Sequence, residues 1–432
     1  MAKRPAAPGP HEPRILRHAC HATNPGNEET LTMKAINVHV HLFYGADPRY
    51  YRPGENIGCL YGYHHAESPE FALTYSRDAR DGKVMRTLRR GLKTVLGFDF
   101  IHTWRNREEI LRSDVVWTHT EHEHLSVALL LLLKGRRQGG PVLLAQSVWL
   151  IDKWPEFGAL RRWAYRKLLA RADMLTTLAS ENAQLMRQYF RREVTQVYYG
   201  LNMKDFPLQE PRAWRPGAPV RIAAIGNDRD RDWNSLVEAF RLDSRYEVRI
   251  ATRRRVPRAL HAENVRIAPA TGLKAARELY DWADVIVVPL RANSHASGIT
   301  VVLEAVALGK PLIVTDVGAL RDYFGPEHVS YVPPHDVAAL RSALETLVAD
   351  PALALSHAQA ASRHFVERDF TTHEFAMQHA RITRDFLRRR TVQGAPHAAD
   401  HAASHAGAHA AGQARASEGA ATSLNRVARS KP

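Results

Sequence analysis

The sequence has little cysteine and no long apolar run, and these two absences exclude several classes of protein. Its 432 residues include only Cys20 and Cys59, which argues against a disulfide framework and fits a reducing cytoplasm. The longest apolar run, near 127–133, is too short to cross a bilayer, and no hydrophobic signal-peptide core precedes it. We therefore expect a soluble, cytoplasmic protein.

Signatures of nucleic-acid binding are also absent, because the chain has neither zinc-finger spacing nor the aromatic pattern of RNA-binding domains. The net charge is nevertheless +15, which favours anionic lipid or anionic small molecules as partners. The segments 86-RTLRRGLKTVLGFDF-100 and 161-RRWAYRKLLARAD-173 mix basic with apolar residues. That mixture suits the surface of an anionic membrane. Two ordinary solvated helix faces are the alternative.

The two ends of the chain differ in composition from the middle. Residues 1–32 are rich in Pro, His and Ala without periodicity, and we expect a disordered leader, with Met33 as a second possible start. Residues 391–432 are rich in Ala, Gly and His, and we expect a disordered tail. The tail histidines recur every four residues, as helical metal ligands do, but its composition argues against a helix. They are His397, His401, His405 and His409.

Strand-like and helix-like segments alternate through the middle of the chain. This alternation predicts parallel sheets covered by helices on both faces. Two series of strands, joined by a polar, Pro-containing segment at 200–219, predict two doubly wound α/β domains. Ligands of such sheets lie at the carboxyl ends of the strands, so we expect the site in a cleft between the domains. The predicted strands are 34–43, 114–119, 142–149, 173–179 and 194–200, then 220–226, 246–252, 284–290, 312–316 and 329–334.

The segment 294-SHASGITVVLEAVALGKPLIVTD-316 carries the clearest chemical signal. Ser297, Gly298, Ile299 and Thr300 have the chemistry of a helix start, where unpaired N–H groups and the helix dipole favour an anion. Glu304 is a lone carboxylate among apolar residues, and such a group needs a hydrogen-bond partner. A phosphate at the helix start and a sugar hydroxyl one turn later would satisfy both. An ordinary carboxylate at the edge of a core helix is the alternative.

A second segment, 222-IAAIGNDRDRDWNSLVEAF-240, places a charged loop after a strand that ends at Gly226. Arg229 and Arg231 stand where this loop would reach a diphosphate in the cleft. Guanidinium groups suit that task because they are always charged and bind phosphate oxygens in pairs. In the alternative interpretation Asp230 and Asp232 neutralise these arginines in local salt bridges.

Together these segments resemble the donor half of retaining GT-B glycosyltransferases, the group 1 or family 4-like class. The motifs are Gly226 to Asp232, 279-LYDWADVIVVPL-290 and 297-SGITVVLEAVALGKPLIVTDVGALRDYF-324, and Tyr199 to Asn202 resembles the linker signature between domains. The resemblance covers about 197–390. It implies a GT-B fold of two Rossmann-like domains, 33–202 on the acceptor side and 203–372 on the donor side, with a helix at 373–390 crossing back. It also implies a nucleotide-sugar donor and no metal or other cofactor.

The resemblance also implies roles for single residues. Glu304 would bind the ribose hydroxyls, and Arg231 and the backbone of 297–300 would hold the diphosphate. The chain departs from the pattern at Ala296, where many members carry a first glutamate. Asn293, His295 or a backbone group would then contact the donor sugar. The resulting set of donor-binding residues is Gly226, Asn227, Arg229, His295, Ser297, Gly298, Ile299 and Thr300, with Asn227 standing where arginine is common.

In the first domain, 114-DVVWTHTEHEHL-125 follows a strand with alternating His and Glu. We expect His119, as a catalytic residue, and Glu121, on the acceptor side, to face the cleft. A metal site and a solvated loop are the alternatives. Tyr44 and Gly45 would belong to an acceptor-side loop after the first strand. The pair at 39 and 41, His-x-His, also occurs in metal-dependent amidohydrolases, but later strands lack the further ligands that those barrels require.

We therefore expect a retaining hexosyl-type glycosyltransferase that moves a sugar from a nucleotide sugar to a lipid-linked saccharide. Its place would be polysaccharide or surface-glycan synthesis, peripheral on the inner face of the cytoplasmic membrane. Two other functions stay open at this point. One is a nucleotide-sugar epimerase on the same scaffold. The other is a catalytically inactive GT-B binding protein, which Ala296 suggests.

Overall fold

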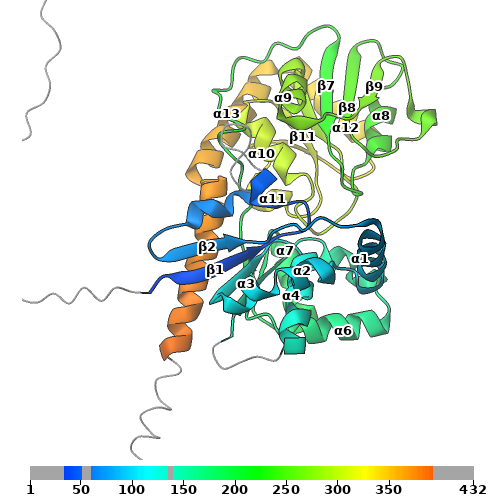
Figure 1. The fold of residues 1–432 in the computed structure, drawn as a ribbon. Coiled ribbons are helices and arrows are strands. Elements are labelled where there is room, and N and C mark those ends of the chain that lie inside the picture. Colours follow the sequence, from blue (N-terminus) through cyan, green and yellow to red (C-terminus); the bar gives the residue numbers. More distant parts are fainter. Residues whose placement is uncertain (1–33, 51–59, 135–139, 393–432) are drawn as a thin grey trace, which may run out of the picture. The chain divides into compact units, whose positions relative to one another are not determined.

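The computed structural model describes residues 34–50, 60–134 and 140–392 (Figure 1). Met33, both cysteines, the predicted leader and the predicted tail beyond residue 392 lie outside the described residues. Within the described ranges, no helix is both long enough and apolar enough to cross a membrane.

The first half of the chain forms a six-stranded parallel sheet in the order β2-β1-β3-β4-β5-β6. Every residue of β3, β4 and β5 is buried. Strands covered on both faces read as continuous apolar runs, which explains why the sequence revealed these three. The strands are Ile36–His41 (β1), Phe71–Tyr75 (β2), Val115–Thr118 (β3), Val142–Ser147 (β4), Met174–Thr177 (β5) and Thr195–Gln196 (β6).

Helices connect these strands and cover the sheet (Figure 1). The α-helices are Lys83–Leu96 (α1), Phe100–Arg105 (α2), Arg107–Arg112 (α3), Glu121–Lys134 (α4), Leu150–Lys153 (α5), Ala159–Leu169 (α6) and Ser180–Phe190 (α7). The 3-10 helices are Pro48–Tyr50 (η1), Leu60–Ala66 (η2) and Trp154–Glu156 (η3).

The second half repeats this plan with a parallel sheet in the order β12-β11-β10-β7-β8-β9. Its strands are Val220–Ile225 (β7), Tyr246–Ala251 (β8), Val265–Ala268 (β9), Val285–Val288 (β10), Leu312–Thr315 (β11) and Ser330–Val332 (β12). Its helices are Trp233–Phe240 (α8), Arg258–Leu260 (η4), Gly272–Trp282 (α9), Ile299–Ala307 (α10), Leu320–Tyr323 (α11), Val337–Ala349 (α12) and Pro351–Glu367 (α13). The predicted fold class, two doubly wound parallel sheets, is confirmed.

Two strands, β2 and β9, were not predicted from the sequence. Each lies at one edge of its sheet, and in each the buried residues alternate with more exposed ones. An edge strand has only one neighbour and buries less apolar surface than a central strand. Each of the two has a single buried residue, Phe71 in β2 and Val265 in β9, so neither shows the uniformly buried run of the central strands.

Residues 372–392 form a last helix, which is drawn in orange in Figure 1. This helix packs on the first half of the chain. Trp117 on β3 donates its indole N–H to Thr383 Oγ1 (2.9 Å), and Arg384 pairs with Glu70, which directly precedes β2. The largest apolar cluster extends from β1 through α10 to this helix and contains residues of both sheets, while each half also has a cluster of its own.

Candidate functional site

A cavity of about 220 Å³, here called the central pocket, lies at the carboxyl ends of strands from both sheets. This is where open parallel sheets place their ligands. The first half of the chain contributes Tyr61, His119, Val148, Trp149, Leu178 and Tyr199, and the second half contributes Asp228, Arg231 and residues 295–300.

The helix α10 begins at this pocket with a glycine in the left-handed region. Gly298 has φ +79°, and a Cβ atom there would lie 2.7 Å from Val288 Cγ1 and 2.9 Å from Arg231 Nη1. Any larger residue would be strained and would displace one of these neighbours. Gly298 therefore brings the N-terminus of α10 close to a cationic side chain.

Arg231 is that cation, and it is almost completely buried, with 5% of the residue exposed. Its Nε lies 3.1 Å from Asp228 Oδ2, while Nη1 has no hydrogen-bond partner in the described part of the chain. A side chain on Gly226 would collide with the guanidinium, so that glycine makes room for it. Because a buried cation requires compensation, Arg231 and α10 together form a site for an anion.

Two hydroxyl groups lie beside this anion site. Ser297 is buried, and its Oγ atom has no hydrogen-bond partner among the described residues. Thr300 is hydrogen-bonded through its side chain to Tyr199, which follows β6. Burial raises the pKa of the Tyr199 phenol to about 12, so the phenol stays neutral.

Glu304 lies farther along α10 and accepts a hydrogen bond from the Tyr280 hydroxyl. Burial raises the pKa of Glu304 to about 7, although Tyr280 and Arg231 act in the opposite direction. Tyr280 is at the C-terminal end of α9 and is fully buried. The tyrosine thus supplies the hydrogen-bond partner that a lone carboxylate on an apolar helix needs. Glu304 is not part of the wall of the central pocket.

A carboxylate from the first half of the chain holds the loop that precedes α10. Asp152 on α5 accepts hydrogen bonds from Ser294 N–H (2.7 Å) and Ser294 Oγ (2.8 Å), and its Oδ2 lies 2.6 Å from His295 Nδ1. The histidine bond and the Ser294 bonds lower the pKa of Asp152 against the effect of its burial. Asp152 therefore orients His295 in the pocket and connects the two sheets.

His119 forms the opposite side of the pocket. Its ring stacks on Tyr61 with a centroid separation of 3.4 Å, and its Nδ1 lies 3.0 Å from the Tyr63 hydroxyl. Gln146 donates to the backbone carbonyl of His119 (3.1 Å). Burial lowers the pKa of His119 well below its ordinary value, so the imidazole is neutral at physiological pH. A neutral ring fits a hydrogen-bonding role better than an ionic one.

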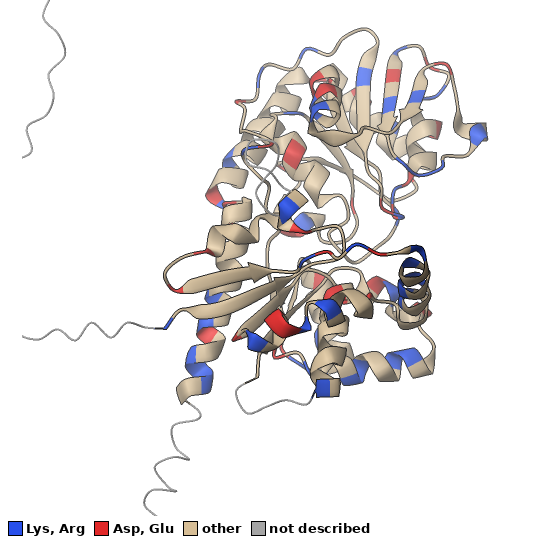
Figure 2. Cartoon of the chain, viewed as in Figure 1, with Lys and Arg blue, Asp and Glu red and all other residues tan. Residues whose placement is uncertain are grey.

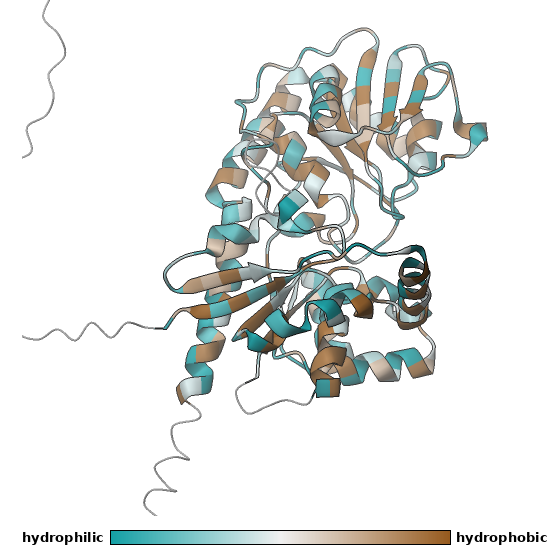
Figure 3. Cartoon of the chain, in the orientation of Figure 1, coloured by the Kyte–Doolittle hydropathy of each residue, from teal (hydrophilic) through white to brown (hydrophobic). Residues whose placement is uncertain are grey.

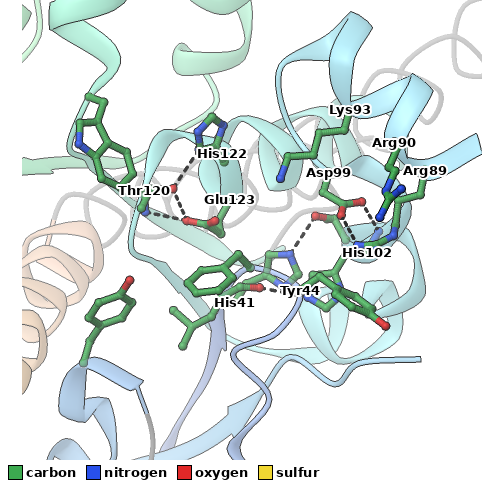
Figure 4. A pocket seen from close by; sticks show the side chains of 15 residues that line it. His41, Tyr44, Arg89, Arg90, Lys93, Asp99, His102, Thr120, His122 and Glu123 are labelled. Carbon is green, nitrogen blue, oxygen red and sulfur yellow. Dashed lines mark hydrogen bonds and ion pairs between the residues drawn. The ribbon is translucent and has the colours of Figure 1, made fainter. Parts of the chain in front are cut away.

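A second cavity of about 390 Å³, the N-terminal pocket, lies within the first half of the chain (Figure 4). Tyr61 and Trp149 line both cavities, so the two pockets adjoin. The side chains labelled in Figure 4 are His41, Tyr44, Arg89, Arg90, Lys93, Asp99, His102, Thr120, His122 and Glu123.

The cations of the N-terminal pocket differ in their partners. Arg89 lies over the Tyr44 ring (3.8 Å from its centroid) and pairs with Asp99 and Asp81. Arg90 and Lys93, one and four residues farther along α1, form no ion pair within the described residues. The pocket therefore holds two cations available to an anionic ligand.

The comparison with protein families finds one match. Residues 220–350 match the model of the family described as "Glycosyl transferases group 1". The matched segment, less than a third of the chain, is similar to group 1 glycosyltransferases and is called the group 1 domain below. The match begins with β7 and ends with α12, so it contains Gly226, Arg231 and Glu304, the three positions that suggested the resemblance.

The similarity to solved structures extends beyond the group 1 domain and covers most of the chain. Sucrose-phosphate synthase from Thermosynechococcus elongatus has a TM-score of 0.62 at 17% identity, over 82% of this chain and 100% of that one. HepE from Anabaena, in complex with UDP-glucose, has a TM-score of 0.56 at 12% identity, over 81% and 99%. A Rickettsia africae glycosyltransferase has 0.52 at 13% identity, over 82% and 99%. The two domains thus form a GT-B fold. No curated protein matches.

The structure brings most of the expected donor-binding residues of the group 1 domain together. Arg231, His295 and the turn 297–300 line the central pocket with His119, and Gly226 lies against the Arg231 guanidinium, where a Cβ atom would collide with it. Asn227 and Arg229 lie outside the pocket wall. Asn227 accepts a hydrogen bond from Arg253 N–H (2.7 Å), and Arg229 is exposed beside Glu156 and Asp230.

Of the three expected acceptor-side residues, Gly45 and Glu121 line neither pocket. Tyr44 lines the N-terminal pocket, but Gly45 does not. Glu121 is turned away from both cavities and is buried under the segment that follows β4. There it accepts from Val148 and Trp149 N–H groups and pairs with Lys153. The expectation for Glu121 was wrong in position because its helix, α4, begins at that residue and directs the carboxylate at the backbone of the next loop.

The alternatives for the first-half histidines can be compared with the same geometry. The segment around His119 is not a solvated loop, since His119, Glu121 and Glu123 are each at most 4% exposed. His39 and His41 lie on the first strand of an open sheet, where they hydrogen-bond to Thr74 and Thr103, so the barrel of an amidohydrolase is excluded. In the described ranges, no group of three His, Cys, Asp or Glu residues is placed to hold a metal ion.

Sequence reasoning missed Tyr61, Asp152 and Tyr280. Asp152 carried a usable signal, because it is an acidic residue shortly after the carboxyl end of β4. Tyr280 stands in a motif that was recognised, but nothing in its neighbours marked it as the partner of Glu304. Tyr61 precedes Gly62 in a kinked 3-10 segment, and both have positive φ. That conformation has no local sequence signal beyond the glycine.

Proposed function

We propose that the protein is a retaining hexosyltransferase that uses a nucleotide sugar as donor and a lipid-linked saccharide as acceptor. The donor would bind in the central pocket, with its nucleoside toward the group 1 domain, and the acceptor in the N-terminal pocket. The product would serve polysaccharide or surface-glycan synthesis, with the enzyme peripheral on the inner face of the cytoplasmic membrane.

The observation that carries this proposal is the incomplete set of partners around Arg231. Arg231 is 5% exposed, and its guanidinium is compensated on one side by Asp228 and has an unpartnered Nη1 within the described structure. Gly298 brings the first turn of α10 against the same group. A helix N-terminus and a buried arginine converge on an anion the size of a phosphate. The diphosphate of a nucleotide sugar satisfies both.

The same arrangement supports catalysis of sugar transfer. As the bond between the sugar and the diphosphate breaks, negative charge grows on the leaving phosphate oxygen. Arg231 and the N–H groups of α10 are fixed in advance where this charge develops, and preorganised charge of this kind lowers the barrier. In the front-face route that the resemblance implies, the leaving phosphate takes the acceptor proton. Glu304, oriented by Tyr280, would hold the ribose hydroxyls.

The acceptor proposal is supported by the N-terminal pocket. The two cavities share Tyr61 and Trp149, so an acceptor hydroxyl in the larger one can reach a donor sugar in the other. Arg90 and Lys93 favour an acceptor that carries an anionic group, as a diphosphate-linked lipid saccharide does. The complex of HepE with UDP-glucose supports a UDP-sugar as the first donor to try.

The test is donor turnover by the full chain against UDP-, GDP- and TDP-hexoses, with released nucleoside diphosphate measured and the sugar product analysed by NMR. Membrane extract supplies the acceptors. We expect release from one donor, a loss of at least 100-fold in Glu304→Ala, and wild-type release in Glu263→Ala, an exposed carboxylate in the same domain. Turnover in EDTA is expected to continue, because Arg231 and α10 supply the positive charge.

Three results would contradict the proposal. Conversion of a nucleotide sugar to its epimer without release of nucleoside diphosphate would establish the epimerase. Binding of a nucleotide sugar without any turnover would establish a binding protein. Failure of every nucleotide sugar to bind would exclude the assignment of the central pocket.

A further inference from the structure

Helix α1 is amphipathic, yet none of its 14 residues is buried. Val84, Leu88 and Val95 recur at helical spacing on one face, and they are 84%, 57% and 71% exposed. A helix of a globular domain normally turns such an apolar stripe into the core. In the described structure this stripe has no covering element.

Helix α6 lies beside the end of α1 and continues the apolar surface. Arg161 donates to the carbonyl of Val95 (3.0 Å), and Tyr165 donates to the carbonyl of Leu96 (2.7 Å). On α6, Leu160 is 78% exposed and Trp163 is 59% exposed. A groove of about 960 Å³, lined mainly by apolar atoms, runs between α1, α4 and α6. Figure 3 shows brown apolar positions on both α1 and α6.

The charge of the two helices has a single sign. Their 25 residues, 14 in α1 and 11 in α6, include no Asp or Glu, and both helices carry several blue residues in Figure 2. The basic residues are Lys83, Arg86, Arg89, Arg90 and Lys93 on α1, and Arg161, Arg162, Arg166 and Lys167 on α6. Apolar side chains flanked by cations alone match the boundary between acyl chains and anionic headgroups.

We propose that α1 and α6 form a docking face for an anionic lipid bilayer, in which Leu160, Trp163 and the Val84–Val95 stripe enter the headgroup region. A second copy of the chain fits this face poorly, because a two-fold contact would bring the same nine cations together. A nucleic acid would pair with the cations but would leave the aliphatic side chains in water. An anionic bilayer both pairs with the cations and removes the apolar side chains from water.

The docking face is continuous with the N-terminal pocket through α1. Arg90 and Lys93 line that pocket, while Val95 and Leu96 of the same helix line the apolar groove. Docking would therefore hold the pocket beside the lipid headgroups, where the saccharide of a lipid-linked acceptor lies. This last step rests on the proposed function, whereas docking itself does not.

The test is co-sedimentation of the full chain with vesicles, without any donor. We expect binding to phosphatidylcholine vesicles containing 30% phosphatidylglycerol, at least 10-fold weaker binding to phosphatidylcholine alone, and weakening in 0.5 M NaCl. Leu160→Ser/Trp163→Ser and Arg162→Glu/Lys167→Glu should each reduce binding at least 10-fold. Val366→Ser removes an exposed apolar side chain and Arg266→Glu reverses an exposed charge in the other domain, and both variants should bind like wild type.

Circular dichroism and thermal unfolding verify that each variant is folded, since all these positions are exposed or partly exposed. Unchanged binding by both double variants would overturn the proposal, because another part of the chain would then hold the lipid. Equal binding to both vesicle types would overturn the role of the cations. A dimer in light scattering that Trp163→Ser converts to monomers, without lipid binding, would make this face a protein interface. Nucleoside diphosphate release, measured without vesicles, tests the proposed function separately.

Discussion

At the scale of single residues, the buried charge of Arg231 lowers the stability of the folded protein. Burial of the guanidinium lowers its pKa, and Asp228 is its only ion-pair partner among the described residues. We expect Arg231→Met to unfold at the same or a higher temperature than wild type, because a buried and partly compensated charge is removed. Donor turnover should fall at least 100-fold, since the diphosphate loses its cation.

Arg229→Met is the matched control for Arg231→Met. Arg229 is two residues earlier, has a 46% exposed side chain and pairs with acidic residues at the surface. We expect its loss to change turnover less than threefold. Calorimetry and nucleoside diphosphate release measure the two quantities for each variant. Equal losses of turnover in both variants would indicate that Arg229 also binds the donor, as the sequence suggested.

Glu304 provides a second prediction at this scale, through pH. Burial raises its pKa to about 7, from an ordinary 4.5. Between these values the folded state keeps a proton that the unfolded chain releases, so the contribution of Glu304 to stability falls as pH rises from 4.5 to 7. Glutamine does not titrate. The free energy of unfolding of Glu304→Gln, relative to wild type, should therefore increase by about 3 kcal/mol between pH 4.5 and pH 8.

Urea titrations at several pH values measure this difference. Glu263→Gln serves as the control, because Glu263 is exposed and its replacement should give a difference that does not vary with pH. A pH-independent difference for Glu304→Gln would mean that the Tyr280 hydrogen bond keeps this carboxylate ionised across the whole range.

At the scale of an element, the start of α10 depends on the absence of a side chain at Gly298. Alanine there would have to adopt φ near +79° and would lie 2.7 Å from Val288 Cγ1. We expect Gly298→Ala to destabilise the protein by about 1–3 kcal/mol and to raise the donor KM, because α10 and Arg231 must move apart. Denaturant unfolding and donor titration measure the two effects.

Gly91 in α1 offers the opposite substitution. A Cβ atom there meets nothing within 4 Å, and the residue lies inside a helix. Gly91→Ala should stabilise the protein by about 0.5–1 kcal/mol without changing the donor KM. A similar loss of stability in both variants would show that strain at Gly298 is not the cause.

At the scale of the whole molecule, Asp152 connects the two domains at the site itself. Its bonds to Ser294 and His295 cross from α5 to the loop before α10. We expect Asp152→Asn to lower kcat/KM by 10- to 100-fold, because His295 loses the carboxylate that orients its ring. Asp322 also bridges the domains, through Ser180 and Gln196, but does not line the central pocket.

Asp322→Asn is therefore the control for Asp152→Asn. It should reduce kcat/KM less than threefold while loosening the domains to a similar degree, as small-angle scattering would report. If the two variants lose activity equally, the bridge acts by closing the domains and not by positioning His295.

The sequence by itself determined the two parallel sheets and the helix that carries Glu304. Central strands such as β4 and β10 are buried along their whole length, and burial on two faces favours the continuous apolar runs that begin β4 and fill β10. The glycine and hydroxyl residues at 297–300 predicted a helix start from local chemistry alone. Edge strands β2 and β9 have one buried residue each, and neither was predicted from the sequence.

Only the tertiary structure decided which side chains share the site. Tyr280 meets Glu304 across 24 residues, and Asp152 meets His295 across 143. Glu121 and Arg229 had suitable chemistry but point at a loop and at the surface. The order of strands and the direction of each helix fix which residues become neighbours. Those depend on the packing of the whole core, whereas helix starts and buried strands depend on interactions within a few residues.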